Sequence, residues 1–267
     1  APKGTEYLLA LRGDPAAGAS LLSVSIQAAM LLARVLDPPG GHSRGLFGRK
    51  LFAFTDDLDV TNRLFFNLRD AEGQDSWGNP KRGNPTGSLA NLRSSAAPDA
   101  ADRMRDGQSW ELCERIGHTL RPDAFTRVGR TSSQDAGVDA DANQIVATAA
   151  LEVGFNDPGV GAVIQHKAPI DPAAFLQRKG RAGRDPRMRP WTVVVLSDYG
   201  RDRLAYQAYD LLFDPELPAR ELPTGNRHVR RMQAAFAALD WLGLRLEGQA
   251  HGSVWQDVSV PVAARSE

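Results

Sequence analysis

The chain of 267 residues has no excess charge of either sign, because its 32 lysines and arginines balance 32 aspartates and glutamates. Any nucleic-acid binding must therefore come from local basic patches. The single cysteine, Cys113, excludes an intrachain disulfide, and no Cys/His cluster has the spacing of a zinc site. We expect a reducing, cytoplasmic location and no metal bound by the chain itself. The longest apolar stretch, from Leu21 to Leu36, is too polar and too short for a membrane span.

Two motifs of nucleotide hydrolases are also missing. No Gly-x-x-x-x-Gly-Lys-Ser/Thr phosphate loop occurs, since the nearest candidate, Gly48-Arg49-Lys50, leads into a predicted strand rather than a helix. No acidic metal box lies on an apolar strand, and Asp56-Asp57 is better explained as a helix cap. No Gly-x-Gly-x-x-Gly follows a predicted strand, which disfavours other kinds of nucleotide-binding α/β domain. The chain by itself therefore has no primary binding site for Mg-ATP.

What is present is an alternation of short β-branched runs and helical stretches. This pattern predicts an α/β fold, with a parallel sheet covered by helices on both faces. Strands are expected at residues 51–54, 126–128, 144–147, 162–165 and 192–196. Helices are expected at residues 20–36, 58–68, 108–120, 200–212 and 226–242.

The composition divides the chain into three regions. We expect a connector helix region at 1–45, the α/β domain at 46–212 and an accessory helical extension at 213–267. Residues 71–107 are rich in Gly, Pro, Asn, Ser and Asp and predict a long loop insertion, with a short helix near residues 89–93. The favoured interpretation is a disordered surface excursion, and the alternative is a lid or strand-contacting loop using Trp77, Lys81 and Arg82.

The most informative string is Gln-Arg-Lys-Gly-Arg-Ala-Gly-Arg at residues 177–184. It places Arg181 and Arg184 three positions apart in a glycine-punctuated turn, and paired guanidinium groups suit phosphate oxygens. Gly180 and Gly183 would let the backbone approach a partner closely. The alternative is a basic surface turn in an arginine-rich protein.

A second string, Ala-Thr-Ala-Ala-Leu-Glu-Val-Gly-Phe-Asn-Asp-Pro at 147–158, precedes the first across the apolar run 162–164. Together the two strings resemble motifs V and VI of superfamily 2 (DEAD/DEAH-like) helicases, over residues 49 to 212. The resemblance implies the second of two RecA-like domains. It also implies that Arg181 and Arg184 face the γ-phosphate of ATP and that Gln177 joins the same polar network.

Motif V begins where a predicted strand ends, the place where open α/β sheets build ligand sites. Thr148 can present a hydroxyl and an amide to an anion there, and the resemblance assigns it to a nucleic-acid phosphate. Gly154 would allow a sharp loop. Relatives have Gly-x-Asp-x-Pro near the nucleotide sugar, whereas this chain has Asn156 at the aspartate position. That contact is in doubt unless Asp157 substitutes for it.

The segment 127–134 lies where relatives contact the nucleic-acid backbone just after a strand. Arg130, Thr131 and Ser132 are the candidates, because arginine and short hydroxyl side chains make sequence-independent phosphate bonds. An ordinary capped loop is the alternative. His166-Lys167 ends another predicted strand and would either line the cleft or be exposed loop polarity.

The expected function is the C-terminal motor half of an ATP-dependent DNA or RNA helicase or translocase, inactive alone. ATP with Mg²⁺ would be held mainly by an N-terminal RecA-like domain in the same or another polypeptide. The chain opens at Ala1 rather than methionine, so we expect a piece of a larger bacterial helicase. The alternative from another class is a non-catalytic nucleic-acid-binding or scaffold module with the same fold.

Overall fold

The computed structural model describes residues 5–13, 20–36, 41–81, 83, 86–116, 125–131, 139–148, 157–217 and 225–245, the last four by their backbone alone. The chain forms two compact units, residues 1–217 and 218–267. Among the described helices, none combines the length and the apolar character needed to cross a lipid bilayer.

The first unit is built on a six-stranded sheet in the order β1-β6-β5-β2-β4-β3, in which every pair of neighbours is parallel. The strands are β1 (Tyr7–Arg12), β2 (Lys50–Phe54), β3 (Val128–Thr131), β4 (Gln144–Ala147), β5 (Val160–His166) and β6 (Trp191–Leu196). Four of the five predicted strands are confirmed. The one predicted at 126–128 shares only Val128 with β3, so Arg130 and Thr131, expected just after the strand, are the last two residues of β3. The sixth, β1, was missed because its sequence, YLLALR, contains no Val, Ile or Thr.

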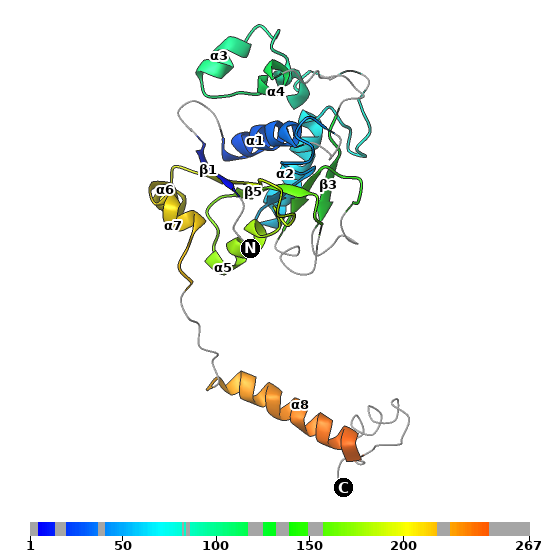
Figure 1. Cartoon of the computed structure of the whole chain (residues 1–267), viewed down its shortest axis with the longest axis vertical. Coiled ribbons are helices and arrows are strands. Elements are labelled where there is room, and N and C mark those ends of the chain that lie inside the picture. Colours follow the sequence, from blue (N-terminus) through cyan, green and yellow to red (C-terminus); the bar gives the residue numbers. More distant parts are fainter. Residues whose placement is uncertain are drawn as a thin grey trace. The chain divides into compact units, whose positions relative to one another are not determined.

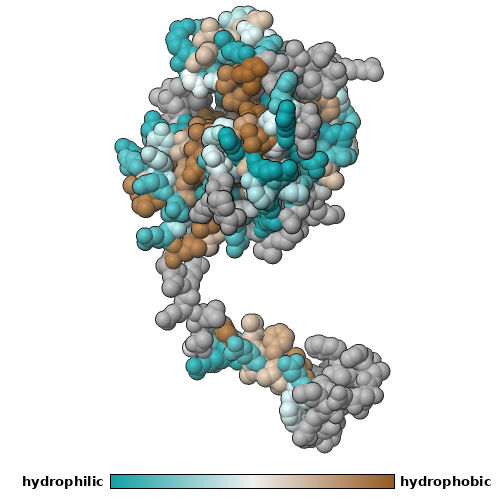
Figure 2. All heavy atoms as spheres, viewed as in Figure 1, coloured by the Kyte–Doolittle hydropathy of each residue, from teal (hydrophilic) through white to brown (hydrophobic). Residues whose placement is uncertain are grey.

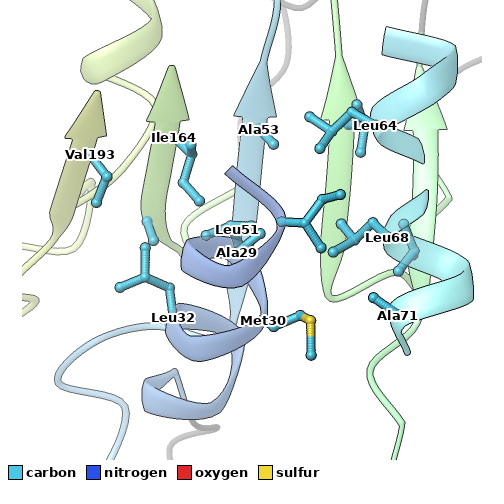
Figure 3. Packing of buried hydrophobic residues seen from close by; sticks show 14 of the residues in the cluster. Ala29, Met30, Leu32, Leu51, Ala53, Leu64, Leu68, Ala71, Ile164 and Val193 are labelled. Carbon is cyan, nitrogen blue, oxygen red and sulfur yellow. The ribbon is translucent and has the colours of Figure 1, made fainter. Parts of the chain in front are cut away.

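One face of the sheet is covered by α1 (Leu21–Val35) and α2 (Leu58–Ala71) (Figure 1). Apolar residues of both helices pack on alternate residues of the central strands (Figure 3), including Leu51 and Ala53 of β2 and Ile164 of β5. Each helix begins at a side-chain cap, Ser20 for α1 and Asp57 for α2. The interpretation of Asp56-Asp57 as a helix cap is thus confirmed at Asp57, and α1 belongs to the same core as the sheet.

The other face carries α5 (Pro172–Lys179), α6 (Gly200–Gln207) and α7 (Tyr209–Phe213). Phe175 of α5 and Phe213 of α7 pack with Val194 and Leu196 of β6. The helix predicted at 200–212 is two helices, since Ala208 leaves helical geometry with φ −117° and ψ 50°. Helices on both faces of a parallel sheet confirm the predicted fold class.

The segment 71–107 contains the 3-10 helix η1 (Leu89–Arg93) and α3 (Ala100–Arg105). Asp70, on α2, accepts hydrogen bonds from the Lys81 ammonium, the Ser88 hydroxyl and the Leu89 amide. The prediction of a disordered excursion is therefore wrong for the described residues, whereas the short helix near 89–93 is confirmed. The sequence interpretation missed this anchoring because the segment has few apolar residues and its contacts with Asp70 are polar.

The alternative interpretation gave the 71–107 segment three contact residues. Of these, Trp77 is 84% exposed, Lys81 binds Asp70, and Arg82 lies outside the described residues. Of the helix predicted at 108–120, the described part contains only α4 (Leu112–Arg115).

The second unit contains α8 (Arg227–Arg245), which confirms the helix predicted at 226–242. Its side chains up to Trp241 are almost all exposed, among them Met232 and Phe236. Figure 2 shows hydrophilic and hydrophobic residues side by side along this helix.

A buried charged network joins α1, α2, η1 and β4. Glu72, 3% exposed, accepts hydrogen bonds from both terminal nitrogens of Arg34, one at 2.7 Å, and from the Gln144 amide at 3.0 Å. The guanidinium of Arg93 lies 3.7 Å away. Burial by itself would raise the pKa of Glu72, but the hydrogen bonds and charge of Arg34 hold it below its usual value.

We predict that Glu72→Gln lowers the free energy of unfolding by about 3–5 kcal/mol, because it leaves a buried arginine without its counter-ion. Urea denaturation of both proteins measures this. The control is Asp59→Asn, which breaks the exposed Arg63–Asp59 pair and should cost less than about 1 kcal/mol. Equal effects of the two substitutions would contradict the prediction.

Candidate functional site

The turn that carries the paired arginines returns to the beginning of the central strand β5. Helix α5 starts at Asp171, whose carboxylate accepts from the Ala173 amide, and ends at Gly180. The Gly183 amide then donates to the Val160 carbonyl at 3.0 Å. We call residues 180–184 the motif VI turn. It lies next to residues 157–159, which lead directly into β5, so the two predicted nucleotide-contacting segments meet.

Helix α5 is held in place by a buried arginine. One terminal nitrogen of Arg178 donates to the Asp56 carboxylate at 2.6 Å and to the Gln165 side-chain oxygen at 2.8 Å. Arg178 is 4% exposed, and Gln165 is fully buried on β5. The bonds therefore link α5, which lies on the sheet face opposite α1 and α2 (Figure 1), to the ends of β2 and β5.

The predicted catalytic residues differ in their access to solvent. Arg184 and Gln177 are exposed, whereas Arg181 is 9% exposed. Ala182, between the two arginines, packs against the apolar cluster of Phe52, Phe54 and Val163. This contact holds the turn against the sheet while Arg184 extends to solvent.

Gly183 has a structural role in the turn that the sequence interpretation did not include. Its φ is +72°, and a Cβ at this position would lie 2.5 Å from Cγ of Pro190. The turn therefore requires a glycine for its own backbone and for packing on Pro190, whereas the predicted close approach of a partner stays a prediction. Gly180, with φ −66°, is in ordinary geometry.

Asp157 is engaged within the protein. Its carboxylate pairs with the Lys50 ammonium at 2.9 Å and accepts from the Gly159 amide at 2.7 Å. Burial by itself would raise the pKa of Asp157, but the bond from Lys50, with that from Gly159, holds it below its usual value. The carboxylate therefore stiffens the turn before β5. Gly154 and Asn156, also predicted to contact a nucleotide, lie outside the described residues.

The predicted nucleic-acid residues gather at the opposite edge, where the strands end. The Thr148 amide, just after β4, donates to the Thr131 carbonyl at the end of β3, at 3.3 Å. Arg130 donates to the Asn62 side-chain oxygen at 2.7 Å, and its guanidinium lies over the Phe65 ring at 5.3 Å. Arg130 and Thr148 keep access to solvent, while Thr131 is buried. Ser132 lies outside the described residues.

His166 does not line an open cleft. It is 6% exposed at the end of β5, and its Nδ1 lies 2.9 Å from the Ser25 hydroxyl on α1. That hydroxyl donates its only proton to the Leu21 carbonyl, so Nδ1 of His166 carries the proton of the shared bond. Burial, with the charge of Lys167, lowers the pKa of His166 to about 4.

The sequence interpretation missed Arg178 and Asp56 as determinants of the site. One signal was available, since Arg178 lies three positions after Phe175 and therefore on the same buried face of α5. A charged residue on an apolar face requires a partner. Nothing local identifies Asp56 as that partner, because it lies 122 positions away.

Comparison with known proteins identifies a family for this segment. Residues 127–186 match the model of the helicase conserved C-terminal domain. The match runs from β3 through the motif VI turn and so includes Thr148, Asp157, Arg181 and Arg184. The predicted resemblance to a helicase C-terminal domain is thereby confirmed over these residues. No curated protein matches the sequence.

Solved helicase structures are also similar. For Dbp5 of S. cerevisiae bound to RNA and ADP BeF3, the TM-score is 0.41 at 14% identity, covering 83% of this chain and 42% of that one. For the Mycobacterium smegmatis helicase Lhr bound to ssDNA and AMP-PNP, it is 0.48 at 14% identity, covering 82% and 23%. For Mss116p DEAD-box helicase domain 2 bound to an RNA duplex, it is 0.38 at 15%, covering 80% and 65%. The chain spans less than half of the first two structures.

We predict that Gly183→Ala destabilises the protein by more than Gly200→Ala. Both glycines have positive φ, so an alanine costs about 1–2 kcal/mol at either position. Only at Gly183 would the new Cβ also collide with Pro190, adding about 1–3 kcal/mol, whereas Gly200 has nothing within 4 Å. Thermal and urea denaturation of the two variants compare these costs. Indistinguishable losses would mean that the contact with Pro190 does not shape the turn.

We also predict a pH dependence that arises from His166. The unfolded chain binds a proton on this histidine near pH 6.5, but the folded protein does so only near pH 4. The unfolded state therefore binds more protons in this window, and stability falls by up to about 3 kcal/mol as the pH drops through it. His166→Gln should flatten the curve relative to the parent, while substitution of the exposed His228 should not. A parent-like curve for His166→Gln would refute this origin.

Proposed function

We propose that this chain is the second RecA-like domain of an ATP-dependent helicase or translocase that acts on DNA or RNA. The observation that carries the proposal is the meeting of the motif VI turn with residues 157–159 at the beginning of β5, inside the segment that matches the helicase C-terminal family. Loops held by a rigid scaffold often carry binding residues.

In the proposed reaction, Arg184 extends from the domain surface to the phosphate that is transferred. Its guanidinium donates to oxygens on which negative charge develops, and Arg181 adds a second positive charge from a more protected position. Gln177 is exposed on the last turn of α5 and would join this polar network. ATP with Mg²⁺ would be bound mainly by a first RecA-like domain, because this sequence contains no phosphate loop.

Buried bonds support this role by restricting the motion of the arginines. Arg178 keeps α5 at a defined depth on the sheet, and the Lys50–Asp157 pair stiffens the adjacent turn. Preorganised donors lose little freedom when the reaction proceeds, which is how electrostatic stabilisation becomes large.

The nucleic-acid contact is proposed at the other edge of the sheet. Thr148 and Arg130 keep solvent access there and can donate to phosphate oxygens without reading bases. Asn62 and Phe65 restrict the guanidinium of Arg130, so a nucleic-acid strand would bind a cation that is already positioned. A cytoplasmic location suits Cys113, which is a buried free thiol.

A second candidate function is a non-catalytic nucleic-acid-binding or scaffold module. The absence of a phosphate loop and an acidic metal box from this sequence favours it over an isolated hydrolase. An upstream gene segment with both motifs, or a separately encoded domain that has them, would favour the motor. Their absence would favour the module.

We predict that Arg184→Ala in the complete motor, this chain joined to its first RecA-like domain, lowers the ATP turnover number about a thousandfold or more. ATP affinity should change little, because the first domain provides most of the binding. Steady-state hydrolysis and titration with a fluorescent ATP analogue measure the two quantities.

The matched control is Arg105→Ala, which removes an exposed arginine of α3 and should leave turnover unchanged. Arg184→Lys should recover little activity, since lysine lacks the forked geometry of the guanidinium. Turnover near the parent value in Arg184→Ala would refute the assignment of the motif VI turn.

A further inference from the structure

A second feature of the first unit is a pocket of about 710 Å³ where β2, β5 and β6 begin. Its walls are the turn of residues 43–49 before β2, the turn at 158–159 before β5, and residues 185–188 after the motif VI turn. The volume is within the range of small-molecule sites. Leu46, Pro158 and Met188 contribute apolar surface, and three arginines contribute positive charge.

The charges of the pocket are unbalanced. Arg44, Arg49 and Arg187 line it together with one carboxylate, that of Asp185, and Arg49 also lies near the Asp157 carboxylate, whose pKa its charge helps to lower. Arg187 already binds Asp185 through two nitrogens, at 2.9 and 3.2 Å, and this bond lowers the pKa of Asp185 to about 2. Among the described residues, Arg44 and Arg49 have no carboxylate oxygen within salt-bridge distance. Asp157, just before the turn at 158–159, already pairs with the Lys50 ammonium at 2.9 Å.

The turn that presents Arg44 and Arg49 is held rigidly. Gly48 packs on Gly161 so closely that a Cβ on Gly161 would lie 1.5 Å from the Phe47 carbonyl oxygen. The Arg49 amide donates to the Gly159 carbonyl at 2.8 Å, and the Arg189 amide donates to the Leu46 carbonyl at 2.7 Å. These bonds attach the turn to the segments that lead into β5 and β6.

Arg44 itself has a strained backbone. Its φ is +53°, a value that residues with a Cβ seldom adopt. Such strain costs about 1–3 kcal/mol and is often found at ligand sites. Gly45, beside it, also has a positive φ, of 78°.

We propose that this pocket binds a nucleotide, with its base against the apolar lining and its phosphates between Arg44 and Arg49. Guanidinium groups bind phosphate oxygens through two parallel hydrogen bonds, and an aromatic ring suits a wall of Leu46 and Met188. Neither Arg181 nor Arg184 lines the pocket, so the proposed site does not use the two arginines assigned to the γ-phosphate of ATP. It requires no first RecA-like domain.

The experiment is isothermal titration of the 267-residue chain with ADP, with pyrophosphate and with adenosine. ADP should bind most tightly, because it alone combines the ring and the phosphates. Arg44→Ala and Arg49→Ala should each weaken ADP at least about tenfold, the loss expected for a charge-assisted pair. Arg105→Ala, which lies outside the pocket, should leave the affinity unchanged.

Arg49→Lys tests whether a loss of ADP binding in Arg49→Ala arises from misfolding instead of from the missing charge. The arginine side chain lies over Gly159, and lysine keeps its charge and most of its length. Thermal midpoints of all variants should match the parent, and Arg44→Ala alone suffices if Arg49→Ala does not fold.

Three outcomes would overturn the proposal: no heat of ADP binding up to about 10 mM, an equal loss in Arg105→Ala, or pyrophosphate binding as tightly as ADP. A single-stranded oligonucleotide that binds more tightly than ADP, and loses affinity in the same variants, would assign the pocket to nucleic acid instead. The titration uses neither ATP turnover nor a first domain, so its failure is distinguishable from failure of the helicase assignment.

Discussion

The candidate site depends on one buried interaction, the binding of Arg178 by Asp56 and Gln165. Helix α5 has only eight residues, and its apolar contact with the sheet is made mainly by Phe175. An arginine buried this deeply cannot lose its counter-ion without a penalty of about 3–5 kcal/mol. The interaction therefore determines how far α5 lies along β5, and with it where the motif VI turn meets the Val160 carbonyl.

The two edges of the parallel sheet have separate roles. All six strands are parallel, so all begin at one edge and end at the other. The beginning of β5 collects Asp157, the motif VI turn and the arginine-lined pocket. The ends of β3 and β4 collect Arg130 and Thr148. A chain with zero net charge thus places arginines at both edges.

Much of the fold could be predicted from the sequence, because the signals are local. The strand at 144–147 has the predicted bounds, since Gln-Ile-Val-Ala is a short buried run between loop residues. The caps and apolar spacing of α1 and α2 are local in the same way. Strand β1 escaped prediction because its stability comes from pairing with β6, near the other end of the unit. The polar anchors on Asp70 escaped it because hydrogen bonds leave no periodic pattern.

The sequence by itself determined the α/β class, most strand positions and the arginine-rich motif, because propensity and spacing act over a few residues. Only the tertiary structure decided which charges meet. Arg178 finds Asp56 122 positions away, and Arg34 finds Glu72 38 positions away, because parallel strands joined by helices bring distant segments to the same edge. Burial then makes each partner necessary, since an unpaired charge in the core is more costly than any local preference can offset.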